Sequence, residues 1–131
     1  MRFAVVRRSL DKITEIQSHI MKIDIIDLNH HLYNGELDLR FRVLREPLGM
    51  TRDQVPFPKE DEFIHFVLTD GTDVHGCVLF HRESSVSGRL LQMAVDQSQQ
   101  GNGLGGQLVS ALETHVAGLG ITTVTLHSRE I

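Results

Sequence analysis

Apolar residues recur along the chain at helical spacing in some segments and at strand spacing in others. Residues 9–21 place three isoleucines at helical intervals behind Ser9, a favourable N-cap, and predict a short amphipathic helix. The isoleucine-rich residues 22–29 that follow are typical of a strand. We therefore expect two parts: an N-terminal helical extension, 1–21, and a main domain, 22–131.

A second helix is predicted from Asn29, its expected N-cap, toward Arg45, because apolar residues there return every three to four positions. Pro47 and Gly49 should end it. The residues expected to face the core are Leu32, Leu39, Val43 and Leu44. The next segment, 51–60, contains two prolines and is predicted to be an irregular, mobile flap.

The remainder of the chain predicts three consecutive strands, a helix and a last strand. Glu62–Thr69 and Val74–Arg82 are rich in apolar and β-branched residues and are separated by a turn of aspartates and glycine, while Arg89–Asp96 follows as a third strand. Residues 103–119 change to helical periodicity, and 121–128 is a β-branched strand. A strand, a crossover helix and another strand imply a parallel pair, so the fold class is α/β with a mixed sheet.

Composition narrows the function classes. The chain has 131 residues, of which 23% are charged, and a formal net charge of −4, which argues against a surface built to bind nucleic acid or an anionic membrane. It contains no apolar run long enough to cross a membrane. Its single cysteine, Cys77, cannot form an intrachain disulfide and agrees with a reducing compartment. These features favour a cytoplasmic protein.

The most informative stretch is a glycine-rich loop directly before the helix at 103–119. Gly101, Gly103, Gly105 and Gly106 let the backbone curl tightly and present N–H groups at a helix N-terminus, an arrangement that favours phosphate. A glycine-rich turn without a ligand is the alternative. The spacing of the glycines also matches the dinucleotide-binding fingerprint of the Rossmann fold. However, three consecutive strands precede the loop, and no strand can follow the acidic residue that this fold requires. A Rossmann fold is therefore disfavoured.

Two motifs and the order of elements resemble the GNAT superfamily of N-acetyltransferases. Its acyl-CoA signature, Gln/Arg-x-x-Gly-x-Gly/Ala after a strand, is matched by residues 100–105 behind Met93-Ala94-Val95. The segment LDLRFRVLREPLGM, 37–50, is similar to the first helix of ElaA-type members. The predicted order of elements over 22–131 is also similar to that of the family.

The resemblance implies a GNAT-like fold, a central mixed sheet flanked by helices, in which 22–131 is an acetyl-CoA-binding domain. It implies acetyl transfer from acetyl-CoA, as donor substrate and without a metal, to an unidentified amine acceptor that attacks the thioester directly. A backbone N–H near Val95 would polarise the thioester carbonyl. The residues implied in donor binding are Met93, Ala94, Val95, Gln100, Gly101, Asn102, Gly103, Leu104, Gly105 and Gly106.

The sequence also departs from the family pattern. Family members continue past the strand corresponding to 121–127 with a helix and strands that often carry a tyrosine acid, whereas the only tyrosine here is Tyr33. Arg89 stands where some members have a glutamate base. We therefore expect a C-terminally truncated fold with weak transfer, and an exposed strand edge that favours homodimerisation or partner binding. A non-catalytic acyl-CoA-binding module and a fragment completed by a partner chain remain as alternatives.

Histidines and the cysteine offer two further hypotheses. His75, Cys77 and His81 share one face of a predicted strand and His65 lies on the strand before it, but same-face neighbours are roughly 6 to 7 Å apart and no fourth ligand is apparent, so no metal site is predicted. His81 or His65 could instead serve as a base on the acceptor side. Cys77 is interpreted as a small buried residue.

Overall fold

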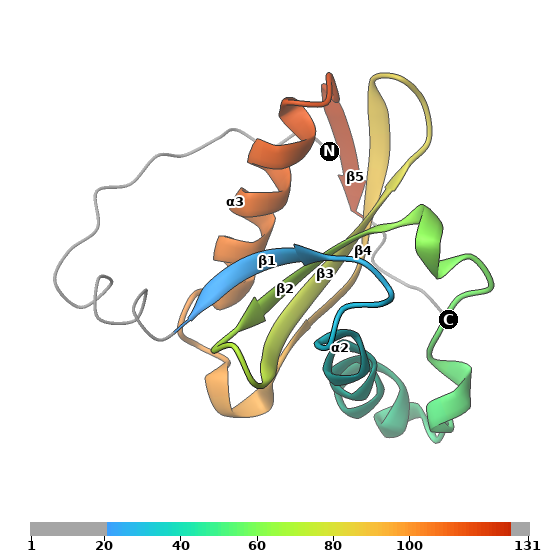
Figure 1. Ribbon diagram of the computed structural model, residues 1–131, viewed down its shortest axis with the longest axis vertical. Helices are drawn as coiled ribbons and strands as arrows, with labels where there is room; N and C mark the ends of the chain where they lie inside the picture. The colour runs from blue at the N-terminus through green and yellow to red at the C-terminus, as the bar shows by residue number, and fades with distance from the viewer. Residues whose placement is uncertain (1–20, 127–131) are drawn as a thin grey trace, which may run out of the picture.

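The structure, a computed structural model, describes residues 21–126, which form one mixed sheet with a helix on each face (Figure 1). The strands lie in chain order: β1 (Lys22–Ile26), β2 (Ile64–Thr69), β3 (Val74–Arg82), β4 (Ser87–Val95) and β5 (Thr123–Leu126). β1 to β4 pair successively in antiparallel fashion, whereas β5 is parallel to β4. The predicted mixed sheet is confirmed, and the helix expected over 9–21 lies outside the described residues except for Met21.

The two long helices pack on opposite faces of this sheet because strand side chains alternate between them. α3 (Leu104–Ala117) covers one face, and its leucines pack against Phe66 and Phe80. α2 (Tyr33–Arg40) covers the other face, where Leu39 contacts the cluster that includes Val67. The crossover from β4 through α3 to β5 produces the parallel pair that the sequence predicts.

The helix predicted from Asn29 to Arg45 is shorter than expected. α2 begins after Leu32, which provides no side-chain cap, while the Asn29 N–H bonds Asp27 in the preceding turn. Asn29 is therefore not the N-cap. After α2 the chain widens into a π-helical turn, η1 (Phe41–Arg45), and tightens into a 3-10 turn, η2 (Glu46–Leu48). Gly49 ends this segment with a φ of 76°, a left-handed conformation that glycine adopts without strain.

The segment 51–60, predicted to be irregular and mobile, is irregular but firmly attached to the core. It contains the 3-10 turn η3 (Arg52–Gln54), and a second one, η4 (Glu60–Glu62), follows it. Val55 and Glu60 are buried, and both contact Arg40: the Val55 carbonyl accepts a hydrogen bond from it, and Glu60 forms an ion pair with it. The interpretation as a mobile flap does not fit these two anchors.

β4 carries an irregularity that the sequence does not predict. Leu79 pairs with Leu91 and Cys77 pairs with Ala94, so two residues of β4 oppose the single residue Val78 of β3. This is a β-bulge, and within it Gln92 has a φ of 55°. A left-handed conformation costs a residue with a Cβ about 1 to 2 kcal/mol, so the surrounding structure must stabilise it.

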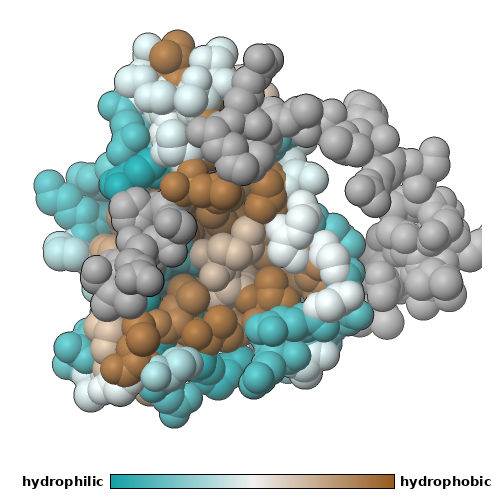
Figure 2. Space-filling view, turned by 180° about the vertical axis from the view of Figure 1, so that it is seen from behind, coloured by the Kyte–Doolittle hydropathy of each residue, from teal (hydrophilic) through white to brown (hydrophobic). Residues whose placement is uncertain are grey.

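Some apolar surface remains exposed. Seen from behind, hydrophobic side chains gather across the centre of the molecule with hydrophilic ones around them (Figure 2). The large apolar residues that are most exposed are Ile25, Leu48, Val86, Leu119 and Leu126. Within residues 21–126, neither α2 nor α3 has the length and hydropathy to cross a membrane.

Candidate active site

The glycine-rich loop joins the end of β4 to the start of α3. Asp96 follows β4 and accepts a hydrogen bond from the Ser98 backbone N–H, which starts the short turn η5 (Gln97–Gln99). The Gln100 side chain folds back and donates to the Val95 carbonyl oxygen at 3.1 Å. Gln100 thus ties the loop to the end of the strand, and the glycines follow from that fixed point.

The glycines of the loop border open space. Gly101 and Gly103 have φ values of 89° and 74°, which explains the need for glycine at both positions. A Cβ at Gly101, Gly103 or Gly106 would meet no protein atom within 4 Å. Gly103 is the N-cap residue of α3, and no side chain caps the first N–H groups of this helix. The first N–H groups of a helix have no partner within it, so this loop can bind an anion with backbone donors.

The last residues of β4 continue past the described pairing with β5. That pairing joins Ser87–Leu90 to Thr123–Leu126. Ala94 is buried on the α2 side of the sheet, whereas Met93 and Val95 are half-buried and pack on the α3 side. Along one edge Ala94 and Val95 pair with β3, and the glycine loop begins shortly after Val95.

A pocket of about 310 Å³ connects this loop with the segment after α2. Its walls come from Arg42, Glu46 and Pro47 on one side and from Asp96, Gln97 and Gln100 on the other. Arg42 and Asp96 form an ion pair of 3.3 Å across it, in which both side chains are partly exposed. The two segments singled out by their sequence motifs, 37–50 and 100–105, therefore meet at one hollow.

Behind β4, between α2 and the sheet, a charged cluster surrounds the buried guanidinium of Arg40. Arg40 donates five hydrogen bonds, matching the five N–H donors of its guanidinium group. Their acceptors are Glu36 at 2.8 Å, the two Glu60 carboxylate oxygens at 2.8 and 2.9 Å, the Val55 carbonyl at 3.3 Å and the Gln92 side-chain oxygen at 3.4 Å. Burial alone lowers the pKa of Arg40, but its contacts with Glu60 and Glu36 raise it above its usual range. Arg40 is therefore a permanently charged residue with no donor left over.

His65 completes this cluster as a cation. Its Nδ1 lies 2.8 Å from a Glu36 carboxylate oxygen, and its Nε2 lies 2.8 Å from the Glu60 carbonyl oxygen. Both neighbours are acceptors, so both ring nitrogens must donate. Burial lowers the pKa of His65, but the hydrogen bond and charge of Glu36 outweigh burial and raise it. Two cations, Arg40 and His65, then balance two carboxylates.

This charge balance bears on two possible roles of the cluster, as a metal site and as the site of a catalytic base. Oxygen or nitrogen atoms of Glu36, Glu60 and His65 lie within 4.8 Å of one another, as metal ligands would, but Arg40 already supplies the positive charge among them. The residues do not fit a metal ion. His65 is only 1% exposed and both of its nitrogens are engaged, so it cannot take a proton from a substrate.

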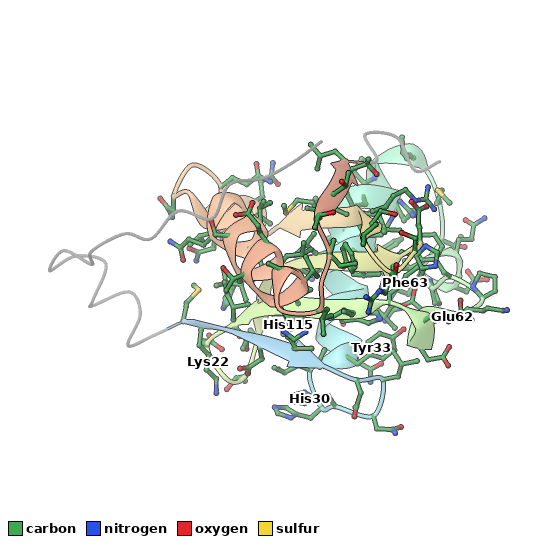
Figure 3. The ribbon with its side chains drawn as sticks, turned by 90° about the horizontal axis from the view of Figure 1, so that it is seen from above. Lys22, His30, Tyr33, Glu62, Phe63 and His115 are labelled. Carbon is green, nitrogen blue, oxygen red and sulfur yellow. The ribbon has the colours of Figure 1, made fainter. Side chains whose placement is uncertain are left out.

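Aromatic rings enclose one side of the cluster. Tyr33 donates to Glu60 at 2.7 Å, and burial together with this carboxylate raises the pKa of the phenol. Phe63 packs edge-on against His81, with 5.2 Å between ring centres. Tyr33 and Phe63 lie near the end of the sheet opposite Lys22 (Figure 3). Tyr33 is therefore committed to the cluster rather than to a leaving group.

The cysteine and the other two strand histidines considered as chemical groups do not come together in one site. Cys77 is fully buried, burial raises the pKa of its thiol, and its Sγ lies 3.5 Å from the Gln92 carbonyl oxygen. This agrees with its interpretation as a buried residue. His75 pairs with Asp70 at the hairpin turn at 3.1 Å. His81 is partly exposed, and its Nδ1 has no hydrogen-bond partner among the described residues.

Sequence reasoning missed the charged cluster and the bulge. The four charged residues of the cluster are spread from position 36 to position 65 and come from α2, η4 and β2. Glutamate and arginine are usually found at solvated positions, and histidine is intermediate, so none of the four residues alone predicts a buried cluster. The only local signal was the spacing of Glu36 and Arg40, which is that of a helical ion pair.

Comparisons with known proteins agree with this geometry. The sequence model of the acetyltransferase (GNAT) family matches residues 29–130. A search of curated proteins finds no match. Among solved structures, the fold is similar to that of a putative N-acetyltransferase from Lactobacillus plantarum, with a TM-score of 0.73 and 22% identity over 83% of this chain and 75% of that one.

Two further structures contain coenzyme A or its acetyl ester. An aminoglycoside 6'-N-acetyltransferase complexed with coenzyme A gives a TM-score of 0.67 at 24% identity, covering 80% of this chain and 60% of that one. A GNAT family acetyltransferase from Elizabethkingia anophelis with acetyl-CoA bound gives 0.61 at 15% identity, covering 82% of this chain. The chain spans 64% of the length of the latter, and at these identities the likeness is one of fold.

Proposed function

The chain belongs to the acetyltransferase (GNAT) family, and we propose that it transfers the acetyl group of acetyl-CoA to an amine acceptor. The observation that carries this proposal is the loop between β4 and α3, where two glycines with positive φ border open space directly before a helix N-terminus. Backbone N–H groups at such a position suit a diphosphate, such as the one that joins the pantetheine arm of acetyl-CoA to its adenosine.

The donor is proposed to lie along the end of β4. Backbone N–H groups of residues 100–106 would bind the diphosphate, and Met93, Ala94 and Val95 would offer backbone groups to the amides of the pantetheine arm. The position of these three residues beyond the described pairing with β5 supports this assignment. So does Gln100, which fixes the loop to the Val95 carbonyl. The ElaA-type subgroup stays a prediction.

The reaction is proposed as a direct attack. The acceptor amine loses a proton and attacks the thioester carbon, the carbonyl oxygen gains negative charge, and the C–S bond breaks to release the thiolate of coenzyme A. A backbone N–H near Val95 would stabilise the charge on oxygen. Holding the amine and the thioester together contributes further, because a bimolecular step becomes effectively unimolecular.

His81 is the histidine that could receive the amine proton. His65 is excluded by its two hydrogen bonds, whereas His81 is partly exposed. His81 also pairs across the sheet with Arg89 of β4, two residues before Leu91 and the bulge. Histidine is the side chain that most often serves as a general base.

Binding of acetyl-CoA tests the donor site, and a matched pair of glycine variants makes the test specific. Gly103→Val should weaken acetyl-CoA binding tenfold or more, about 1.4 kcal/mol, because the side chain would enter the space above the loop. Gly120→Val introduces a similar backbone strain, at a φ of 89°, at the other end of α3, and should bind like the wild type. Calorimetric titration measures both.

The outcome that would contradict donor binding is equal affinity of the wild type and Gly103→Val. NADH serves as a control ligand and should not compete. Release of free thiol with a panel of amines then tests transfer itself. Binding without release would favour a non-catalytic acyl-CoA-binding module.

A further inference from the structure

Gln92 links the buried charged cluster to the part of β4 proposed to bind acetyl-CoA. It is 2% exposed, and its side-chain oxygen accepts a hydrogen bond from Nε of Arg40 at 3.4 Å. Its own backbone, with a φ of 55°, forms the bulge. The residue therefore touches α2 with its side chain and shapes β4 with its main chain.

The bulge decides how the rest of β4 is presented. In a regular strand, side chains alternate between the two faces, and N–H groups alternate between the two neighbouring strands. The extra residue inverts this alternation, so that Met93 and Val95 pack on the α3 side while Ala94 is buried beside Cys77. Loss of the bulge would shift every residue from Met93 onward to the opposite face.

The side chain that holds Gln92 is itself fixed. The other four donors of Arg40 are engaged by Glu36, Glu60 and the Val55 carbonyl, which come from three different segments. Glutamine, unlike glycine, is strained at a positive φ. Gln92 nevertheless occupies this position in the bulge, and its side-chain oxygen accepts the hydrogen bond from Arg40. The hydrogen bond between Arg40 and Gln92 therefore connects α2 to the bulge.

We propose that Arg40 is a positioning residue for acetyl transfer: acting through Gln92, it holds the bulge of β4 and thereby orients the backbone from Met93 to Val95 toward the thioester. This inference rests on the proposed function. Arg40 itself contacts no substrate. Its effect should be larger on the rate of the chemical step than on the binding of acetyl-CoA, because the glycine loop proposed to hold the diphosphate lies beyond the bulge.

Two variants of Gln92 separate this role from general stability. Gln92→Met keeps the length of the side chain and removes the acceptor oxygen, and we expect kcat to fall by about 10- to 100-fold. Gln92→Glu keeps an acceptor oxygen at the same reach and should keep kcat within about fivefold of the wild type, while its added buried charge should lower the melting temperature. The KM for acetyl-CoA should change by a smaller factor than kcat, because the glycine loop is untouched and only the contacts of Met93 to Val95 with the pantetheine arm are disturbed. Amide signals of Met93 to Val95 in NMR spectra should move in Gln92→Met.

Val116→Ala is the control for stability, because Val116 is buried on α3 against the opposite face of the sheet. It should lower the melting temperature and leave kcat unchanged. Wild-type kcat in Gln92→Met, an equal fall in Gln92→Glu, or unmoved amide signals from Met93 to Val95 would each overturn the proposal. Failure of the proposed function is seen separately, as a wild-type protein that does not bind acetyl-CoA in calorimetry; the amide signals still decide whether Arg40 holds the bulge.

Discussion

Glu36, Arg40, Glu60 and His65 are buried as four charges with no net charge. An isolated charge at such depth would be strongly unfavourable, and removing one member of a buried pair is typically far more costly than the pair is stabilising. Because Arg40 bonds two carboxylates and His65 bonds one of them, each charge has an opposite neighbour within 3 Å. The cluster therefore contributes to a defined arrangement of α2, η4 and β2 more than to stability.

The raised pKa of His65 makes the stability of the domain depend on pH. A group whose pKa is higher in the folded state stabilises fully below its unfolded pKa, about 6.5, and this contribution is lost as the pH rises through the raised folded pKa. We expect His65→Gln to lower the free energy of unfolding by about 3 kcal/mol at pH 6 and to flatten its decline above neutrality. Urea unfolding from pH 5.5 to 9.5 measures both, and parallel curves for the two proteins would contradict the assignment.

At the scale of elements, the sequence predicts the regular structure well and the transitions poorly. The hairpin, the third strand and α3 follow from alternation, turn residues and a leucine stripe, which are local signals. The π-helical turn at Phe41–Arg45 continues the apolar spacing of α2, so periodicity cannot distinguish it from one long helix. Gln92 carries none of the glycine or asparagine preference that usually marks a positive φ, so the bulge has no local signature.

The start of β4 provides a prediction at the same scale. A Cβ at Gly88 would overlap the ring of Phe80 and lie 2.6 Å from the His81 carbonyl oxygen. Gly88→Ala should therefore lower the free energy of unfolding by about 1 to 3 kcal/mol through overpacking. Gly106→Ala, in the first turn of α3 with open space around it, should instead raise it by up to about 1 kcal/mol. Equal effects in denaturant unfolding would show that packing at Gly88 is not the cause.

At the scale of the whole molecule, the described core is formed by residues of the main domain. Both apolar clusters draw their buried members from positions between 26 and 124, and Met21 packs against the one under α3. The division into an extension, 1–21, and a domain, 22–131, stays a prediction. A shortened chain that begins at Met21 should keep the unfolding transition and acetyl-CoA binding of the full chain. An insoluble or non-binding product would show that the earlier residues belong to the domain.

Acetyl-CoA binding should also be visible as stabilisation of the entire fold. The proposed donor site takes residues from β4, the glycine loop and α3, so the ligand can bind only when these elements are assembled. A ligand at one hundred times its Kd stabilises the folded state by about 2.7 kcal/mol, which raises the melting temperature of a domain this size by roughly 10 °C. Gly103→Val should lose most of this increase while Gly120→Val keeps it. Thermal unfolding at several acetyl-CoA concentrations provides the measurement, and a melting temperature that does not depend on concentration would contradict the proposed donor site.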